Sequence, residues 1–370
     1  MAEKRKRDSG IEVLRILAIM MVIGLHVFKY GNYYEQAELV GGFVRIISIG
    51  IRVLFIPAVD IFVLISGYFM VKMRFNIKKA YKRVFKIYAV ILFYSVVLSL
   101  LSLLLGPEFH SINGNKDSLA IIIARMVLPI TSQTWYFLSH YIVMCLLAPF
   151  VNIILQNIKK NDYHVLLVVT TFLMSIWFMM AHMRFLDKVV TISFFSDIKK
   201  GMSVFSFLYL YIIGGYIWLH TEKNDKPNIK YILFALGCLI TNGLLFTVLE
   251  KTLELNDVVL YYSNPFVILM AVMLLMYFKD LHFHSKIINA LASTTIGVYA
   301  IHEFRYVREL LWNMFDFRKV DCSNMFLNMV YIISIIVMVF GVCAIIDLLR
   351  QKLFRVFEKQ EIKSSASVEG

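Results

Sequence analysis

The stretch IYAVILFYSVVLSLLSLLLG (residues 87–106) is almost entirely apolar and contains no charged side chain. A helix that crosses the hydrocarbon core of a bilayer needs about 20 mostly apolar residues, whereas a transmembrane β-strand needs about half that number and alternates in polarity. Residues 87–106 are long enough for such a helix and do not alternate. They therefore predict an α-helix that spans a membrane.

Nine further stretches of similar character flank this one. The ten predicted spans cover about residues 12–30, 48–71, 86–106, 135–155, 163–182, 203–219, 230–249, 260–278, 287–303 and 326–348. The expected fold is all-α, a polytopic integral membrane bundle of about ten transmembrane helices that forms one domain over residues 11–350. A basic segment (residues 1–10) precedes it, and a polar tail (residues 351–370) that we expect to be disordered follows it.

The overall composition agrees with this fold. A soluble domain has about 25% charged and roughly 45–50% apolar residues, whereas this chain has 17% charged and 59% hydrophobic residues and a mean hydropathy of +0.72. Such a chain lacks the polar surface that an ordinary soluble enzyme needs. The four cysteines (Cys145, Cys238, Cys322 and Cys343) form no C-x-x-C pair, so neither a metal site nor a disulfide framework is expected.

The net charge of +13 is explained by membrane topology. If the N-terminus is cytoplasmic, the inner segments hold 23 Lys and Arg residues and the outer loops hold 12. Cytoplasmic loops of membrane proteins carry this kind of excess. We therefore expect both termini in the cytoplasm and no nucleic-acid partner.

The first span, IEVLRILAIMMVIGLHVFKY (residues 11–30), carries Arg15 and His26. Eleven helical residues separate them by about 16 Å and almost three whole turns, so both side chains share one helix face. Arg15 is predicted near the cytoplasmic boundary and His26 well inside the membrane. Each residue has a structural alternative, since an interfacial arginine can extend to lipid headgroups and a histidine can bond to a neighbouring helix. Together they suit an anionic donor that enters at Arg15 and a proton acceptor at His26.

The second span contains Asp60 three residues after Pro57. Its depth is predicted to match that of His26, so Asp60 is a candidate for the carboxylate that orients the His26 imidazole and stabilises its protonated form. The alternative is a structural ion pair between Asp60 and Arg52. A basic segment (residues 72–86) follows, in which Lys79 and Arg83 lie one helical turn apart. It is suited either to lipid headgroups or to the phosphates of a donor.

Weaker candidates for substrate contacts lie in two later spans. Trp135 and Tyr136 open the fourth span and His140 follows one turn later, while His302 and Glu303 close the ninth at its outer boundary. Each has a structural alternative. Trp135 and Tyr136 are typical of aromatic residues at a membrane interface, His140 could be hydrogen-bonded within the bundle, and His302 and Glu303 could be exposed polar residues at the interface.

The segments that carry these residues resemble acyltransferase family 3. Arg15 and His26 in the first span, AVDIFVLISGYF (residues 58–69) and the basic K-x3-R segment after it are similar to motifs of that family. TWYFLSHYIVMCLLAPFVN (residues 134–152) and GVYAIHE (residues 297–303) are similar to two further motifs. The resemblance covers about residues 11–350.

The resemblance implies a membrane acyltransferase that O-acetylates a surface polysaccharide from the bacterial cytoplasmic membrane. It implies acetyl-CoA or another acyl-CoA as a cytosolic co-substrate, no permanently bound cofactor, and a glycan or lipid-linked sugar as acceptor. His26 is implied as the catalytic group, and Arg15, Lys79 and Arg83 as donor contacts. The chain departs from the family pattern at Lys79, where an arginine is usual and where lysine cannot make the same bidentate phosphate contact. No soluble esterase-like domain of the kind that some members carry is expected either.

Two other classes of function fit the same buried charges. A transporter or flippase for a lipid-linked sugar or anionic solute would use them as a permeation or proton-coupling path. A membrane module that binds a ligand without chemistry is the third interpretation. Transporters often have interrupted helices in paired halves, and the sequence shows no such internal repeat.

Overall fold

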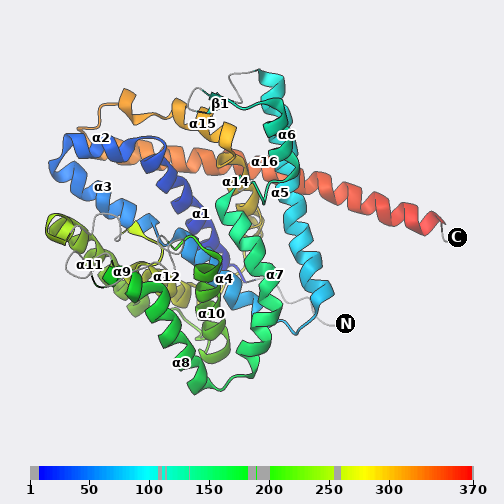
Figure 1. The fold of residues 1–370 in the computed structure, drawn as a ribbon, viewed down its shortest axis with the longest axis horizontal. Helices are drawn as coiled ribbons and strands as arrows, with labels where there is room; N and C mark the ends of the chain where they lie inside the picture. Colours follow the sequence, from blue (N-terminus) through cyan, green and yellow to red (C-terminus); the bar gives the residue numbers. More distant parts are fainter. Residues whose placement is uncertain are drawn as a thin grey trace.

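The computed structural model of the protein describes residues 8–106, 111–112, 115–132, 134–181, 189, 201–253 and 260–368. Within them, the stretches long and apolar enough to cross a membrane are α1 (Gly10–Lys29), α3 with α4 (Gly42–Phe55 and Ala58–Met70), α5 (Ile77–Leu105), α7 (Tyr136–Asn157), α8 to α9 (Lys160–Ala181) and residues 325–356 of α16 (Met325–Val368). Shorter apolar helices are α10 (Val204–His220), α11 (Ile229–Leu253) and α12 (Pro265–Phe278). Their arrangement is a helical bundle of the membrane type (Figure 1).

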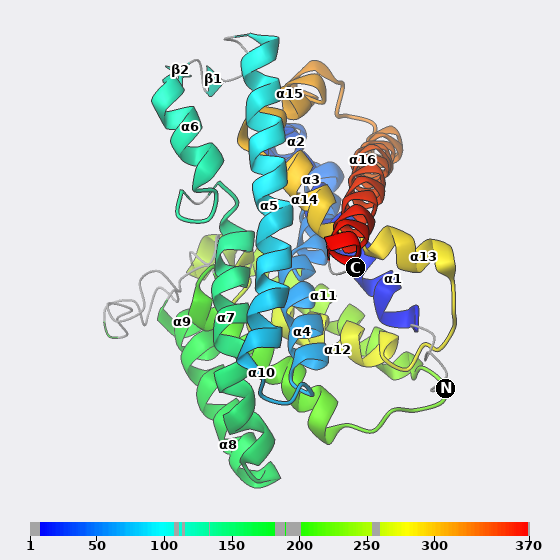
Figure 2. The ribbon, with the colours of Figure 1, turned by 90° about the vertical axis from the view of Figure 1, so that its right-hand side faces the viewer.

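Shorter elements lie in several predicted loops and in the predicted span over residues 287–303. They are α2 (Tyr33–Val40), β1 (Ser111–Ile112), β2 (Asn115–Lys116), α6 (Leu119–Val127), α13 (Lys286–Ala292), α14 (Thr295–His302), α15 (Arg305–Met314) and the 3-10 turn η5 (Phe317–Lys319). Figure 2 shows α6 and the small antiparallel β1–β2 pair next to the upper end of α5, with α15 nearby. A π-helical turn, η2 (Phe172–Ile176), joins α8 (Lys160–Thr171) to α9 (Trp177–Ala181).

The predicted span over residues 48–71 is interrupted rather than continuous. α3 ends at Phe55, and α4 begins at Ala58 after the N-cap residue Pro57. Proline lacks the N–H that would continue the helical hydrogen bonds, while Ile56 before it keeps helical backbone angles. The interruption opens onto a large cavity, because Ile56 and Val59 both line it.

The predicted span over residues 287–303 is interrupted as well, into α13 and α14. At the junction, the Ser293 hydroxyl donates to the Ala290 carbonyl and the Thr294 hydroxyl donates to the Leu291 carbonyl. These side chains bond to carbonyl groups that a continuing helix would have used. Two of the predicted spans are therefore each divided into two helices, and both junctions face the same cavity.

α4 is largely buried and packs on α10, α1 and α12. Its contact with α10 depends on two glycines that face each other. A Cβ atom at Gly67 would lie 2.2 Å from the Tyr211 carbonyl oxygen, and one at Gly214 would lie 2.2 Å from the Leu64 carbonyl oxygen. Small residues allow membrane helices to approach this closely. The close packing holds the backbone of α4 in place beside the cavity.

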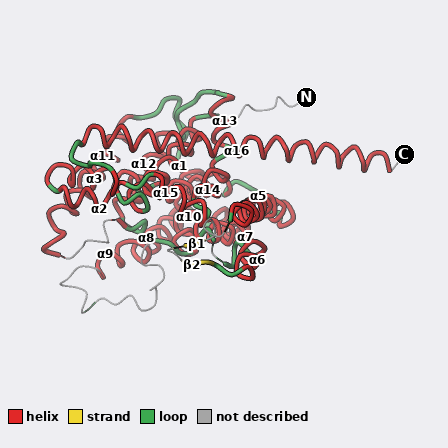
Figure 3. The backbone as a smooth tube through the Cα atoms, turned by 90° about the horizontal axis from the view of Figure 1, so that it is seen from above, coloured by secondary structure: helices red, strands yellow, loops and turns green. Residues whose placement is uncertain are grey.

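α16 continues well beyond the bundle. It runs without a break to Val368 and projects past the other helices (Figures 1 and 3). The expectation of a disordered tail over residues 351–370 is thus corrected, since residues 351–368 continue the helix. Most of the basic N-terminal segment, residues 1–7, lies outside the described residues.

Candidate active site

A cavity of about 620 Å³, called the main cavity below, runs along one face of α1. Arg15 lines it near the start of α1, His26 lines it eleven residues further on, and Lys29 lines it at the end of the helix. The predicted common face of Arg15 and His26 is therefore the face that borders the cavity. We call its two ends the Arg15 end and the Lys29 end.

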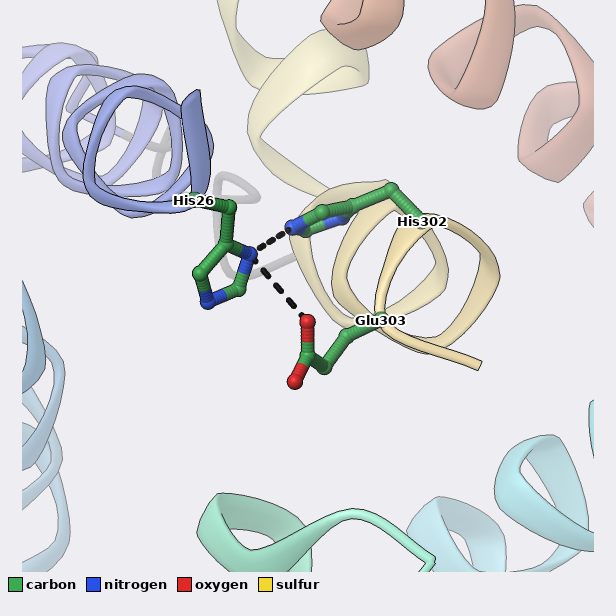
Figure 4. Close-up of side chains that lie close together, drawn as sticks. All are labelled: His26, His302 and Glu303. Atoms are coloured by element: carbon green, nitrogen blue, oxygen red, sulfur yellow. Dashed lines mark hydrogen bonds and ion pairs between the residues drawn. The ribbon is translucent and has the colours of Figure 1, made fainter. Parts of the chain in front are cut away.

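His26 meets two side chains that come from α14, far away in the sequence. Its Nδ1 atom lies 3.2 Å from Nε2 of His302 and 3.2 Å from Oε2 of Glu303 (Figure 4). His302 is fully buried, and Glu303 is 6% exposed. The other ring nitrogen of His26, Nε2, points away from both residues (Figure 4).

The hydrogen bonds assign protons to these two rings in their neutral forms. Nδ1 of His302 lies 2.6 Å from the Val298 carbonyl oxygen, which can only accept, so this nitrogen carries the proton. Nε2 of His302 is then an acceptor, and Nδ1 of His26 must be the donor that faces it. This leaves a free lone pair on Nε2 of His26, which is the atom that a general base or nucleophile needs.

Glu303 is held in place by partners on its other oxygen. Nη1 of Arg308 lies 2.8 Å from Oε1 of Glu303, and the Tyr30 hydroxyl lies 3.5 Å from the same atom. The Arg308 guanidinium also lies over the Tyr30 ring, 4.7 Å from its centroid. These contacts leave Oε2 facing His26, where it can stabilise an imidazolium.

The turn that follows α1 is fixed by η5. The Phe317 N–H donates to the Gly31 carbonyl at 2.8 Å, and the Asn32 side chain donates to Asp316 at 3.1 Å. Hydrogen bonds from Arg318 hold the pKa of the Asp316 carboxyl well below its usual value. A charged Asp316 thus keeps the loop beside Tyr30 in place.

The expected contact between Asp60 and His26 is not present. Asp60 is fully buried, but neither of its carboxylate oxygens has a hydrogen-bond partner among the described residues, and it does not line the main cavity. It interacts electrostatically with Tyr209 of α10. The alternative ion pair with Arg52 is also absent, because Arg52 lies over the Tyr34 ring and lines the cavity. Depth in the membrane was predicted to bring Asp60 to His26, but depth does not determine which way a helix faces.

At the Arg15 end, Arg15 forms an ion pair with Glu12. The Tyr141 hydroxyl lies 3.1 Å from the Ser66 hydroxyl, and both residues line the main cavity beside Arg15. The side chain of Arg15 remains 20% exposed, so it can still meet a ligand in the cavity.

Lys79 and Arg83 lie in a second cavity of about 430 Å³. Arg74 and Cys145 line it as well. Cys145 lies one turn after Tyr141 on α7, so the two cavities follow each other along this helix. From Leu138 in the main cavity to Ala148 in the second, α7 rises by about 15 Å.

The three predicted candidates at the start of α7 have different surroundings. Tyr136 lines the main cavity. The indole N–H of Trp135 donates to the Ala300 carbonyl at 3.1 Å and its ring packs on Phe304, so Trp135 joins α7 to α14. Nδ1 of His140 bonds to the Tyr136 carbonyl at 2.7 Å. Neither Trp135 nor His140 lines either cavity.

Several residues of the site were not found from the sequence. They include Arg308 and Tyr299, which line the Lys29 half of the main cavity. Arg308 lies in a segment read as an outer loop, and its only sequence signal is that it follows Glu303 by five residues. His302 and Glu303 were expected to contact an acceptor, and their contact with His26 was not foreseen.

The fold and the site define a helical membrane protein with a cavity among its helices that is lined by Arg15 towards one end, by His26 and by Lys29. Its family is established by a match over residues 8–348 to the acyltransferase domain of acyltransferase family 3, and the chain belongs to that family. It is therefore a membrane acyltransferase. No curated protein and no solved structure gives a significant match.

Proposed function

We propose that the protein transfers an acetyl or other acyl group from cytosolic acyl-CoA to a hydroxyl group of a cell-surface or lipid-linked glycan. We place it in the cytoplasmic membrane of a bacterium with the Arg15 end towards the cytoplasm. The observation that carries this proposal is the order of groups along one path: Arg83 and Lys79 in the second cavity, Arg15 at the near end of the main cavity, and His26 beyond it.

The donor would occupy this path from end to end. CoA carries several phosphate groups and ends in a long, thin arm with the thioester at its tip. Arginine and lysine side chains bind phosphate by charge-assisted hydrogen bonds. Arg83, Lys79 and Arg74 would bind the phosphates, and the arm would follow α7 past Tyr141 to reach His26.

The acceptor hydroxyl would meet the thioester at Nε2 of His26. In direct transfer, this nitrogen takes the hydroxyl proton while the oxygen bonds to the thioester carbon. The C–S bond then breaks, and the thiolate takes the proton from the imidazolium to leave as CoA thiol. Alternatively, Nε2 of His26 attacks the thioester carbon and the C–S bond breaks, releasing CoA thiolate. The acceptor oxygen then takes the acyl group from Nε2, and the acceptor proton passes by way of Nε2 to the thiolate. In both routes Glu303 stabilises positive charge on the ring.

The proposal is tested by following the label from labelled acetyl-CoA in membranes that contain the protein. We expect incorporation into glycan or lipid, and loss of at least about 10²-fold in turnover for His26→Ala. His164→Ala is a matched control, since His164 lies outside both cavities and bonds to the Tyr216 hydroxyl. Undiminished transfer by His26→Ala at equal protein abundance would contradict the role of His26.

One observation favours a second candidate function. The two interrupted helices, α3–α4 and α13–α14, both border the main cavity. Interrupted helices at a central cavity are typical of transporters, so movement of a lipid-linked sugar through the bundle is the alternative. Transport of a labelled lipid-linked sugar without acylation of any acceptor would support it over the proposed glycan acylation.

A further inference from the structure

The first turn of α7 lies on the wall of the main cavity. No side chain caps this helix at Trp135, whose indole group can only donate and is bonded to Ala300. Tyr136, Phe137 and Leu138, the first three residues of α7, all line the cavity. Their N–H groups have no partner within the helix, and the positive end of the dipole of a 22-residue helix lies at this point.

A second donor points to the same place. Tyr299 lines the main cavity, and its hydroxyl is buried and has no hydrogen-bond partner among the described residues. The Tyr299 ring packs edge-on against Phe137, with 5.5 Å between the ring centroids. The Phe137 N–H is directed towards the Tyr299 hydroxyl without forming a hydrogen bond of ordinary geometry. A buried hydroxyl without a partner destabilises a fold, and a ligand that accepts its hydrogen bond removes that cost.

Tyr299 and the first turn of α7 line the same cavity as His26. Tyr299 precedes His302 by three residues on α14, and the two rings lie 5.9 Å apart between centroids. His302 is the residue whose Nε2 contacts Nδ1 of His26. An acyl carbonyl placed at Nε2 of His26 would therefore have Tyr299 and the start of α7 on the wall of the same cavity.

We propose that the Tyr299 hydroxyl and the first-turn N–H groups of α7 form an oxyanion site for the acyl group. The inference rests on the proposed function. As the acceptor oxygen bonds to the thioester carbon and its proton moves to Nε2 of His26, the C=O electron pair moves onto the carbonyl oxygen. The site binds that oxyanion. When the C=O bond forms again, the C–S bond breaks and the thiolate takes the proton from His26.

Hydrogen-bond donors directed at a developing oxyanion act mainly in the transition state. Removing one of them lowers turnover and leaves ground-state binding nearly unchanged. The test is Tyr299→Phe, which removes the hydroxyl and keeps the ring that packs on Phe137. We expect the maximal rate of label transfer from acetyl-CoA to fall about 10²–10³-fold, with KM for acetyl-CoA within about threefold of its starting value.

The matched control is Tyr163→Phe. Tyr163 is also a buried tyrosine, but its hydroxyl donates to the Ile212 carbonyl at 2.8 Å and it lines neither cavity. We expect it to leave both kinetic constants unchanged. Melting temperatures and protein abundance in detergent are measured for both variants, so that a loss of folded protein is not mistaken for a loss of turnover.

Each outcome decides between named alternatives. A Tyr299→Phe enzyme that keeps its maximal rate, or that changes only KM, overturns the oxyanion site. If His26→Ala is inactive in that same experiment, the proposed function stands without the oxyanion site. If the unaltered protein transfers no label to any acceptor, the proposed function fails, and the oxyanion site that depends on it fails too.

Discussion

The two interrupted helices of the bundle each bring a buried carboxyl group into the membrane domain, but only one of these groups has partners. In α13–α14, Glu303 follows the second half-helix and is bound by Arg308 and Tyr30 on one oxygen while the other faces His26. In α3–α4, Asp60 lies in the first turn of the second half-helix and has no hydrogen-bond partner among the described residues.

The two buried carboxyl groups differ in their partners: Glu303 is positioned against His26, whereas Asp60 has no hydrogen-bond partner among the described residues. A charge inside a bilayer costs several kcal/mol, and it persists only where partners offset that cost. Glu303 has a cation, a phenol and an imidazole within reach, so it can stay charged beside a reacting histidine. Neither carboxylate oxygen of Asp60 has a hydrogen-bond partner among the described residues. We therefore expect the chemistry to depend on Glu303 and to be insensitive to the charge of Asp60.

The largest effect is expected for Glu303→Gln. Glutamine keeps the size of the side chain and can still accept from Arg308, but it carries no charge to stabilise an imidazolium at His26. Removing the carboxylate that orients a catalytic histidine costs up to about 10⁴-fold in turnover in a well-studied hydrolase. We expect a fall of about 10²–10³-fold in the transfer of label from acetyl-CoA.

Glu38→Gln provides the control for this variant. Glu38 is also paired with an arginine, Arg45, but it lines neither cavity, so its substitution should leave the rate unchanged. A Glu303→Gln enzyme with a rate within threefold of normal would remove the basis of the comparison between the two carboxyl groups.

A smaller effect is expected for Arg308→Met. This change keeps most of the side-chain volume and removes the ion pair that positions Oε1 of Glu303. Because Glu303 itself remains, its Oε2 atom can still reach His26 part of the time. We expect a loss of about tenfold in turnover, of the size that an imperfectly positioned catalytic group produces, and partial recovery in Arg308→Lys. Equal activity in the Met and Lys variants would show that the positive charge of Arg308 plays no part in positioning Glu303.

The sequence predicted the character of the fold well and the partners of the site poorly. Residues 87–106 lie almost wholly in α5, and Pro57 marks the interruption of α3–α4, because both signals are local. The face shared by Arg15 and His26 follows from the helical repeat alone, and the cavity borders that face. These features need no knowledge of any other part of the chain.

The pairing of His26 with His302 and Glu303 joins residues about 276 positions apart, and no local pattern could predict it. Asp60 was chosen because its depth matched that of His26. A new helix starts after Pro57, and Asp60 in its first turn does not line the cavity that His26 lines. Trp135 looked like a residue of the membrane interface, yet it is buried because its indole group joins two helices.

A still smaller effect is expected for Asp60→Asn. The amide has the same shape as the carboxyl group, and it removes a group that would be costly to ionise in this position. We expect transfer activity within about threefold of normal, and a melting temperature in detergent that is unchanged or higher. A loss of activity comparable with that of Glu303→Gln, at normal protein abundance, would mean that Asp60 reaches the reacting groups in a conformation different from this one.

The smallest effect, none at all, is expected from metal removal. Ligand atoms of His26, His302 and Glu303 lie within 4.8 Å of one another, so this group could hold a metal ion. Two histidines and a carboxylate are a common ligand set for zinc. A metal ion would take the lone pair of Nδ1 of His26, and the proton of the neutral ring would then lie on Nε2, where it blocks the action of that atom as a base. Base chemistry at His26 and metal binding by the cluster therefore exclude each other.

We expect treatment of the purified protein with a chelator to leave transfer activity and melting temperature unchanged, and elemental analysis to find no stoichiometric metal. Loss of activity that returns only with added zinc would show that Glu303 ligates a metal ion and does not stabilise an imidazolium.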